Sequence, residues 1–289
     1  MLSSLKGATV PRQSLTERQR ARMLALMQVC YAGVDAERFV ADLADKQYVI
    51  LLSERRTGEL VGFSTLRVSR ETMEGREVEV VFSGDTVIHP DYWGQKELQV
   101  RFVGFMLGRL LRHPTRPLLW LLLSGGYKTY LLAVNHFPRT VPRHDWRPSE
   151  ARLAFLRALT QRWFGEQFDV ARGTLRFAEG HYRVREGVSP IDRASLAHPH
   201  IAFFARQNPG HVEGEELVCL AEMRWRDLAW ALVGLIWSAT TSTPVGSSNA
   251  SRSARSATSV LPEPTSPCTS LFMGRSADRS AATSAPTDR

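Results

Sequence analysis

The chain is poor in cysteine and has no hydrophobic run long enough to cross a membrane. Its three cysteines, Cys30, Cys219 and Cys268, are far apart and odd in number. Such a set indicates neither a disulfide framework nor a CxxC metal-binding pair, and it fits a reducing compartment. The longest apolar runs, 118–123 and 228–237, fall well short of the roughly 20 residues that a spanning helix needs. We therefore expect a soluble, cytoplasmic protein.

The sequence also lacks the short motifs that identify several enzyme classes. It contains no GxSxG, HExxH or GxxxxGK(S/T) pattern, which argues against a nucleophile elbow, a zinc-protease helix and a P-loop. His198 and His200 flank Pro199 and have no carboxylate or cysteine cluster near them in the sequence. We interpret these histidines as part of a surface turn, and the sequence predicts no metal site.

Positive charge is in excess. The formal net charge is +8 and the pI is near 9.8, a balance that suits an anionic ligand or surface. Between residues 98 and 149, eight Lys or Arg residues accompany a single acid, Asp145. This stretch would attract a ligand with several negative charges, although ordinary solvated charge would give the same count.

The composition divides the chain into two parts. From Ser238 onward, 34 of the 52 residues are Ser, Thr, Ala or Pro. A segment of this kind buries too little apolar surface to offset its chain entropy. We expect one folded domain over residues 12–237 and a disordered, low-complexity tail over 238–289, which a change of reading frame would also explain.

Within the domain, hydrophobic periodicity and turn residues predict an alternation of helices and strands. Capping residues at Ser14, Asp35 and Ser149 each precede a helical pattern. The expected strands are 48–52, 60–68, 78–88, 118–123, 174–184 and 216–220, and the expected later helices are 95–111, 127–132, 150–163 and 199–207.

The stretch 78–111 is the most informative, because it predicts a strand, a tight turn and a long helix in succession. Unpaired backbone N–H groups and the positive end of the helix dipole then meet at one place, which suits a phosphate group. The strand is interrupted by the polar, Gly-containing segment 83–86. This break predicts a β-bulge whose freed N–H groups can hold a carbonyl oxygen, the alternative being two short strands joined by a turn.

The turn resembles the cofactor-binding motif of the GNAT superfamily of acyl-CoA N-acyltransferases. Val87, Pro90, Tyr92 and Gly94 match the motif. The chain departs from the motif at three positions. Trp93 stands where the family usually has Arg or Gln, Lys96 stands where it has Gly, and Leu98 stands where it has Gly or Ala. The resemblance, which also covers the order of elements over 15–111, implies an α/β fold of GNAT type with a mixed central sheet flanked by helices.

The resemblance further implies a site for acetyl-CoA or another acyl-CoA as co-substrate. The residues that it assigns to cofactor binding are Val87, Ile88, Trp93, Gly94, Gln95 and Lys96. In this fold the strand at 118–123 parts from its neighbour where the acyl-CoA lies. We therefore expect Gly125 and Gly126 to line the same place as Gly94.

The same resemblance suggests the catalytic residues. A base for the attacking amine is often a Glu on the strand that here carries Glu79, with Asp85 at the break of that strand. The acid for the departing thiolate is often a Tyr on the following helix, here Tyr127 or Tyr130, of which we favour Tyr130. The alternatives are a solvent-facing Glu79 and tyrosines that only pack.

The expected function is transfer of an acyl group, most simply acetyl, from acyl-CoA to a small-molecule or peptide amine. Two alternatives stay open: a relative that keeps the fold but binds a ligand or partner without catalysis, and a relative that uses an acyl-carrier protein. No nucleic-acid partner is expected.

Overall fold

The computed structural model describes residues 3–177, 183–184 and 191–230. The expected tail, 238–289, and most of the stretch between 178 and 190 lie outside these residues. In the described part of the chain, no helix combines the length and the apolar character that crossing a membrane requires.

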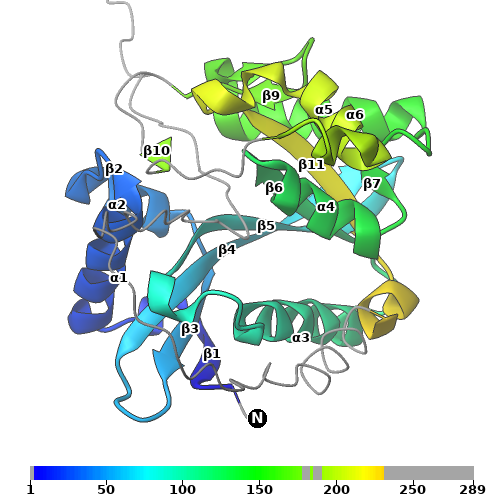
Figure 1. The fold of residues 1–289 in the computed structure, drawn as a ribbon. Helices are drawn as coiled ribbons and strands as arrows, with labels where there is room; N and C mark the ends of the chain where they lie inside the picture. Colours follow the sequence, from blue (N-terminus) through cyan, green and yellow to red (C-terminus); the bar gives the residue numbers. More distant parts are fainter. Residues whose placement is uncertain (1–2, 178–182, 185–190, 231–289) are drawn as a thin grey trace, which may run out of the picture.

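One large sheet forms the centre of the molecule (Figure 1). Its strand order is β1-β3-β4-β5-β6-β11-β9-β8, with β7 beside β11. Every pairing in it is antiparallel except that of β5 with β6. The bounds of these strands are β1 (Leu5–Pro11), β3 (Tyr48–Glu54), β4 (Leu60–Met73), β5 (Arg76–Ile88), β6 (Leu118–Ser124), β7 (Thr140–Val141), β8 (Phe168–Asp169), β9 (Thr174–Leu175) and β11 (Glu216–Met223). A separate small sheet pairs β2 (Tyr31–Ala32) with β10 (Arg183–Val184).

Helices cover both faces of the sheet. They are α1 (Glu17–Cys30), α2 (Ala36–Ala44), α3 (Glu97–Arg112), α4 (Tyr127–His136), α5 (Glu150–Phe164) and α6 (Pro199–Gln207). Side chains of α1 and α2 share one buried cluster with β3 and β4, and those of α5 share another with β5, β6 and β11. Side chains of α3 and α4 form the cluster on the opposite face. The expected mixed sheet flanked by helices is therefore confirmed.

The local sequence explains most helix starts. Asp35 and Ser149 accept hydrogen bonds from the backbone N–H groups of Arg38 and Arg152, as their capping role predicts. The first helix begins differently from the expectation, because Thr16 is its cap and forms a capping box with Gln19.

Two parts of the sheet differ from the expected strands. The edge strand β1 was not expected, because apolar and polar residues alternate only weakly in its sequence. The strand is ordered by its antiparallel pairing with β3. The expected strand 174–184 is divided, because Thr174–Leu175 belongs to the large sheet and Arg183–Val184 to the small one.

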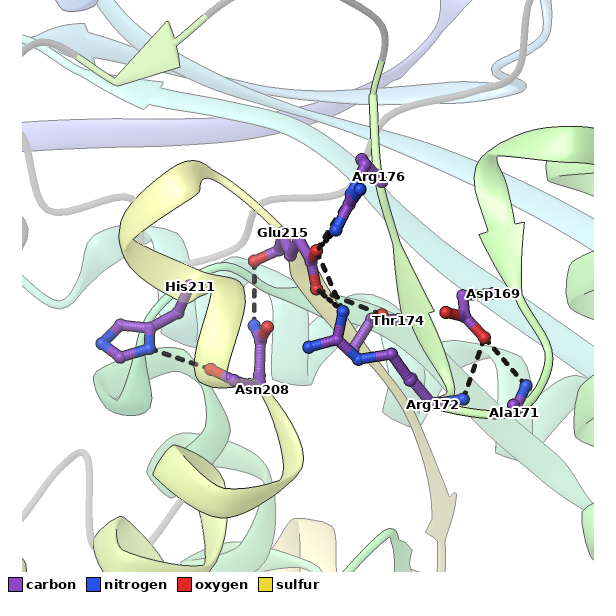
Figure 2. A network of polar contacts seen from close by, with 8 residues as sticks. All are labelled: Asp169, Ala171, Arg172, Thr174, Arg176, Asn208, His211 and Glu215. Carbon is purple, nitrogen blue, oxygen red and sulfur yellow. Dashed lines mark hydrogen bonds and ion pairs between the residues drawn. The ribbon is translucent and has the colours of Figure 1, made fainter.

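A buried carboxylate fixes the far end of the sheet (Figure 2). The carboxylate of Glu215, the residue directly before β11, accepts hydrogen bonds from Arg172, Thr174 and Arg176, which lie in and around the β8–β9 hairpin. Its backbone carbonyl accepts a hydrogen bond of 2.8 Å from the Nδ2 atom of Asn208. These contacts satisfy the buried charge and join the hairpin to β11, which assigns this acid a structural role.

Candidate functional site

The parallel strands β5 and β6 are paired at one end and separate at the other. Their pairing runs from Glu79 with Leu118 to Phe82 with Leu121. Beyond it, β5 continues along β4 as far as Ile88, and β6 continues along β11. We call the two diverging segments, 83–88 and 122–124, the wedge. Segment 83–88 is paired with β4 on its outer side and segment 122–124 is paired with β11 on its outer side. On the sides that face each other, backbone N–H and C=O groups are therefore left for a ligand.

A β-bulge lies at the start of the wedge. Ser64 of β4 pairs with Thr86, and Leu66 pairs with Ser83. Two residues of β5, Gly84 and Asp85, therefore oppose the single residue between Ser64 and Leu66. The Oγ1 atom of Thr86 lies 3.2 Å from the carbonyl oxygen of Gly84, to which it donates. The bulge expected from the polar break in the strand is confirmed.

A buried group of charged side chains accompanies the bulge. Asp85 is 5% exposed and Lys46, in the loop after α2, is 1% exposed. The Nζ atom of Lys46 donates to the carbonyl oxygen of Asp42 over 2.9 Å. Burial lowers the pKa of Lys46, and the nearby carboxylates of Asp85 and Asp42 oppose that shift. Carboxylates held in this way can bind an amine and accept its proton.

A further polar atom at the bulge lacks a partner. The Oγ1 atom of Thr65, the residue of β4 opposite the bulge, is buried and makes no hydrogen bond within the described part of the chain. A buried hydroxyl without a partner is costly, and a substrate or a water molecule would satisfy it.

The end of β6 leads directly into α4. Gly126 is the N-cap residue of α4, and no side chain caps the helix there, so its first backbone N–H groups remain available as donors. Tyr127 is the first residue of α4 and is half-buried. Nearer the paired end, the Nε1 atom of Trp120 donates to the Oγ atom of Ser83 over 3.0 Å and joins the two strands.

Tyr130 is held away from solvent by α6 and by the loop after β7. Its ring packs against Phe203 and Phe204, and its hydroxyl donates to the carbonyl oxygen of Pro142 over 3.1 Å. Burial raises the pKa of Tyr130 above its usual value. A hydroxyl with this partner and a raised pKa is a weaker proton donor than an ordinary tyrosine.

Glu79 lies where β5 and β6 are still paired. Its carboxylate is 3% exposed and accepts two hydrogen bonds of 2.6 Å from the Nε and NH2 atoms of Arg109 on α3. The NH1 atom of Arg116 lies 3.9 Å away. This bidentate pair joins α3 to the closed end of the wedge. The arrangement suits an anchor better than a base, because both oxygens are already occupied.

The turn after β5 begins with two buried residues and a fixed indole. Val87 and Ile88 are buried, and the Nε1 atom of Trp93 donates to the carbonyl oxygen of Ile88 over 2.8 Å. Gly94 follows with a φ of +83°, a conformation that favours glycine. The turn thus directs the chain into α3 with an exposed glycine at its tip.

The last residues of the turn meet the N-terminal segment and the start of α3. Gln95 donates to the Oγ atom of Ser4 over 2.6 Å and accepts from the Oγ atom of Ser3 over 2.9 Å. Lys96 is exposed and is the N-cap residue of α3, which begins at Glu97 and not at Gln95 as expected. Glu97 places an acid in the first turn of α3, where its Oε1 atom accepts from the backbone N–H of Gly7 over 3.0 Å.

Sequence reasoning placed Asp85 at the break in its strand but pointed to neither Lys46 nor Thr65. Lys46 follows a short helix and precedes an apolar strand, a position typical of solvated lysines. Its burial results from the approach of the loop after α2 to β5, which no local pattern reveals.

Comparisons with known proteins give similarity in fold only. No family model matches the chain, and no curated protein matches it significantly. Among solved structures, an acetyltransferase of Trypanosoma brucei is 17% identical over 50% of this chain and 97% of that one, with a TM-score of 0.34. ElaA of Escherichia coli is 16% identical over 50% and 94%, with a TM-score of 0.33. A conserved protein of unknown function from Enterococcus faecalis is 15% identical over 44% of this chain but only 32% of its own length, with a TM-score of 0.34.

Proposed function

We propose that this chain, which resembles the GNAT superfamily in fold, transfers an acyl group from acyl-CoA to an amine. One observation carries the proposal. The parallel strands β5 and β6 diverge beside a β-bulge, and the buried carboxylate of Asp85 lies in that bulge; a bulge frees backbone N–H groups from strand pairing. A thioester needs donors for its carbonyl oxygen, and the attacking amine needs a group that accepts its proton.

The reaction is direct attack without a covalent enzyme intermediate. The amine nitrogen forms a bond to the thioester carbon, and the carbonyl oxygen becomes an oxyanion that backbone N–H groups at the bulge stabilise. The C–S bond then breaks, CoA leaves as a thiolate, and the carbonyl is restored. The amine loses its proton to a base and the thiolate gains one from an acid, so charge balances over the cycle.

We assign the base to Asp85 and the acid to Tyr127. Asp85 lies in the bulge, at the start of the wedge and beside Lys46, whereas Glu79 lies at the paired end of the strands, where Arg109 binds it. Tyr127 begins α4 immediately after β6, whereas the hydroxyl of Tyr130 is bound to Pro142. The roles of Glu79 and Tyr130 stay predictions that the variants in the Discussion test.

The pyrophosphate of the cofactor would lie at the start of α3. The first backbone N–H groups of a helix favour an anion, and here they follow the exposed residues Gly94 and Lys96. The pantetheine arm would then run from Trp93 along Val87 and Ile88 toward the bulge. Acetyl is the simplest acyl group that this arrangement accommodates.

The acceptor is an amine, on a small molecule or a peptide. The carboxylate of Asp85 at the bulge would favour a substrate that arrives as an ammonium ion. One observation favours the non-catalytic alternative, because Glu97 adds a negative charge to the helix start that would hold the pyrophosphate.

Calorimetry decides between these functions. Acetyl-CoA should bind the full chain with an affinity that falls as salt is added, because the attraction is partly ionic. Lys96→Ala should weaken binding about 3- to 5-fold, the value of one exposed ion pair.

Lys6→Ala is the matched control for Lys96→Ala. Lys6 is exposed on the edge strand β1, next to Gly7, whose side-chain position faces Arg101 of α3, so the lysine points away from that helix. The control should bind acetyl-CoA as the unaltered chain does. Absence of heat with acetyl-CoA and with longer acyl-CoAs, for a folded sample, would remove the transferase and leave the non-catalytic function.

A further inference from the structure

Two histidines and an aspartate meet where the loop after β7 approaches the start of α6. They are His144, Asp145 and His200, and one nitrogen or carboxylate oxygen from each lies within 4.8 Å of the other two. The ring centroids of His144 and His200 are 4.3 Å apart. His144 and Asp145 are exposed and His200 is half-buried, so the group is open to solvent on one side.

The fold holds this group together through contacts made by Tyr130. The hydroxyl of Tyr130 binds the carbonyl oxygen of Pro142 in the loop, and its ring centroid lies 6.2 Å from that of His200 on α6. The loop itself follows β7, which pairs with β11 of the large sheet. The three side chains are therefore brought together by packing, before any ligand arrives.

His200 carries a polar atom without a partner. Its Nδ1 atom is buried and makes no hydrogen bond to any residue that the structure describes. An unprotonated imidazole nitrogen is a strong acceptor and a common metal ligand.

Asp145 supplies the negative charge of the group. Its two carboxylate oxygens accept hydrogen bonds of 2.5 and 2.8 Å from the Nε and NH2 atoms of Arg143. Each oxygen keeps a second lone pair, and the guanidinium fixes the carboxylate as outer partners of metal ligands do.

We propose that His144, Asp145 and His200 bind a divalent metal ion of the Zn²⁺ class. Two imidazole nitrogens and one carboxylate oxygen are a donor set that suits this ion, and three protein ligands leave one position for water. Ligand atoms around Zn²⁺ lie about 3.4 Å apart in a tetrahedral site. The three ligand atoms lie within 4.8 Å of one another, and rotation of the exposed His144 side chain would bring its nitrogen closer to the other two. The ion would join the loop after β7 to α6.

The site could not be found from the sequence, because His144 and His200 are separated by 55 intervening residues. The neighbouring His198, whose ring centroid is 5.9 Å from that of His200, belongs to the pair that we interpreted as a surface turn. The site shares no residue with the wedge, so it stands or falls independently of acyl transfer.

Titration of the untagged full chain, first stripped with a chelator, tests the proposal with Zn²⁺ itself. One equivalent should bind, and His144→Ala, Asp145→Asn and His200→Ala should each weaken binding by at least the ~10- to 100-fold that loss of an outer-shell partner costs. His136→Ala, which removes an exposed histidine at the end of α4, is the matched control and should bind as the unaltered chain does.

Thermal unfolding supplies a second measurement in case His200→Ala folds poorly. Free Zn²⁺ at about 100 times its Kd should raise the Tm of the unaltered chain and of His136→Ala by about 5 °C or more. It should leave the Tm of His144→Ala and Asp145→Asn, both at exposed positions, nearly unchanged. No binding by the unaltered chain, or equal binding by all variants, would overturn the proposal.

Discussion

Arg109→Met should lower the free energy of unfolding by about 3 kcal/mol or more, because it leaves the carboxylate of Glu79 buried and without its main partner. Glu79 is 3% exposed and Arg109 14% exposed, so solvent screens their interaction poorly. Arg116, at 3.9 Å, compensates only in part. Denaturant unfolding monitored by circular dichroism measures the loss.

Two further variants make this test specific. Arg162→Met removes the arginine of an exposed pair, since Arg162 is 59% exposed beside Glu71, and should cost at most about 1 kcal/mol. The double variant Glu79→Gln with Arg109→Met should be more stable than Arg109→Met alone, because the unpaired charge is gone.

Glu79→Gln alone also separates an anchor from a base. If Glu79 is an anchor, this variant loses stability while the turnover of its folded molecules stays within a few-fold. A fall in turnover of about 10²-fold at unchanged stability would instead make Glu79 the base, and a small effect of Arg109→Met would contradict the structural role of the pair.

Tyr127→Phe should lower the turnover of acyl transfer by about 10²-fold while acyl-CoA affinity holds, because the change removes a proton donor and keeps the ring. Turnover is measured as release of free CoA thiol in the presence of an amine. Asp85→Asn should lower the turnover by a similar factor, because an amide accepts no proton from the amine.

Tyr130→Phe is the matched control, and it tests our first preference between the two tyrosines. We expect its turnover to stay within a few-fold and its stability to fall by about 1 kcal/mol, the value of one hydrogen bond. If Tyr130→Phe alone lost about 10²-fold in turnover, the assignment of the acid would be reversed. If neither tyrosine variant did, solvent or another residue would supply the proton.

The alkaline limb of the stability curve gives Tyr130 an independent signature. Its pKa is raised in the folded chain, so above the ordinary value of about 10 the unfolded chain ionises this residue first. The unfolded state then binds fewer protons, and the free energy of unfolding falls as the pH rises. Tyr130→Phe should show less of this fall.

Local patterns in the sequence were sufficient to predict much of the sheet and most of its helices. The uninterrupted apolar run of β6 indicated a buried strand, and the capping residues Asp35 and Ser149 marked two helix starts. The strand β1 could not be found in this way, because the edge position that orders it depends on a partner, β3, more than 30 residues later.

In the candidate site, too, local sequence predicted one feature and failed to predict another. A Gly beside polar residues within an apolar strand indicated the bulge at Gly84 and Asp85. Whether a polar residue was free or bound was not readable, because it depends on the neighbours that the fold supplies. Arg109 lies on another element 30 residues after Glu79, and α6, which covers Tyr130, begins 69 residues after it.

Hydrogen exchange with and without acetyl-CoA tests most directly whether the cofactor lies between β5 and β6. Saturating acetyl-CoA should slow exchange of the backbone amides in 83–88 and 122–127 and at the start of α3, because the ligand accepts from these groups and excludes water. The β8–β9 hairpin at the far end of the sheet should exchange as before. Unchanged exchange across the wedge, for a folded chain with acetyl-CoA at saturating concentration, would contradict the account.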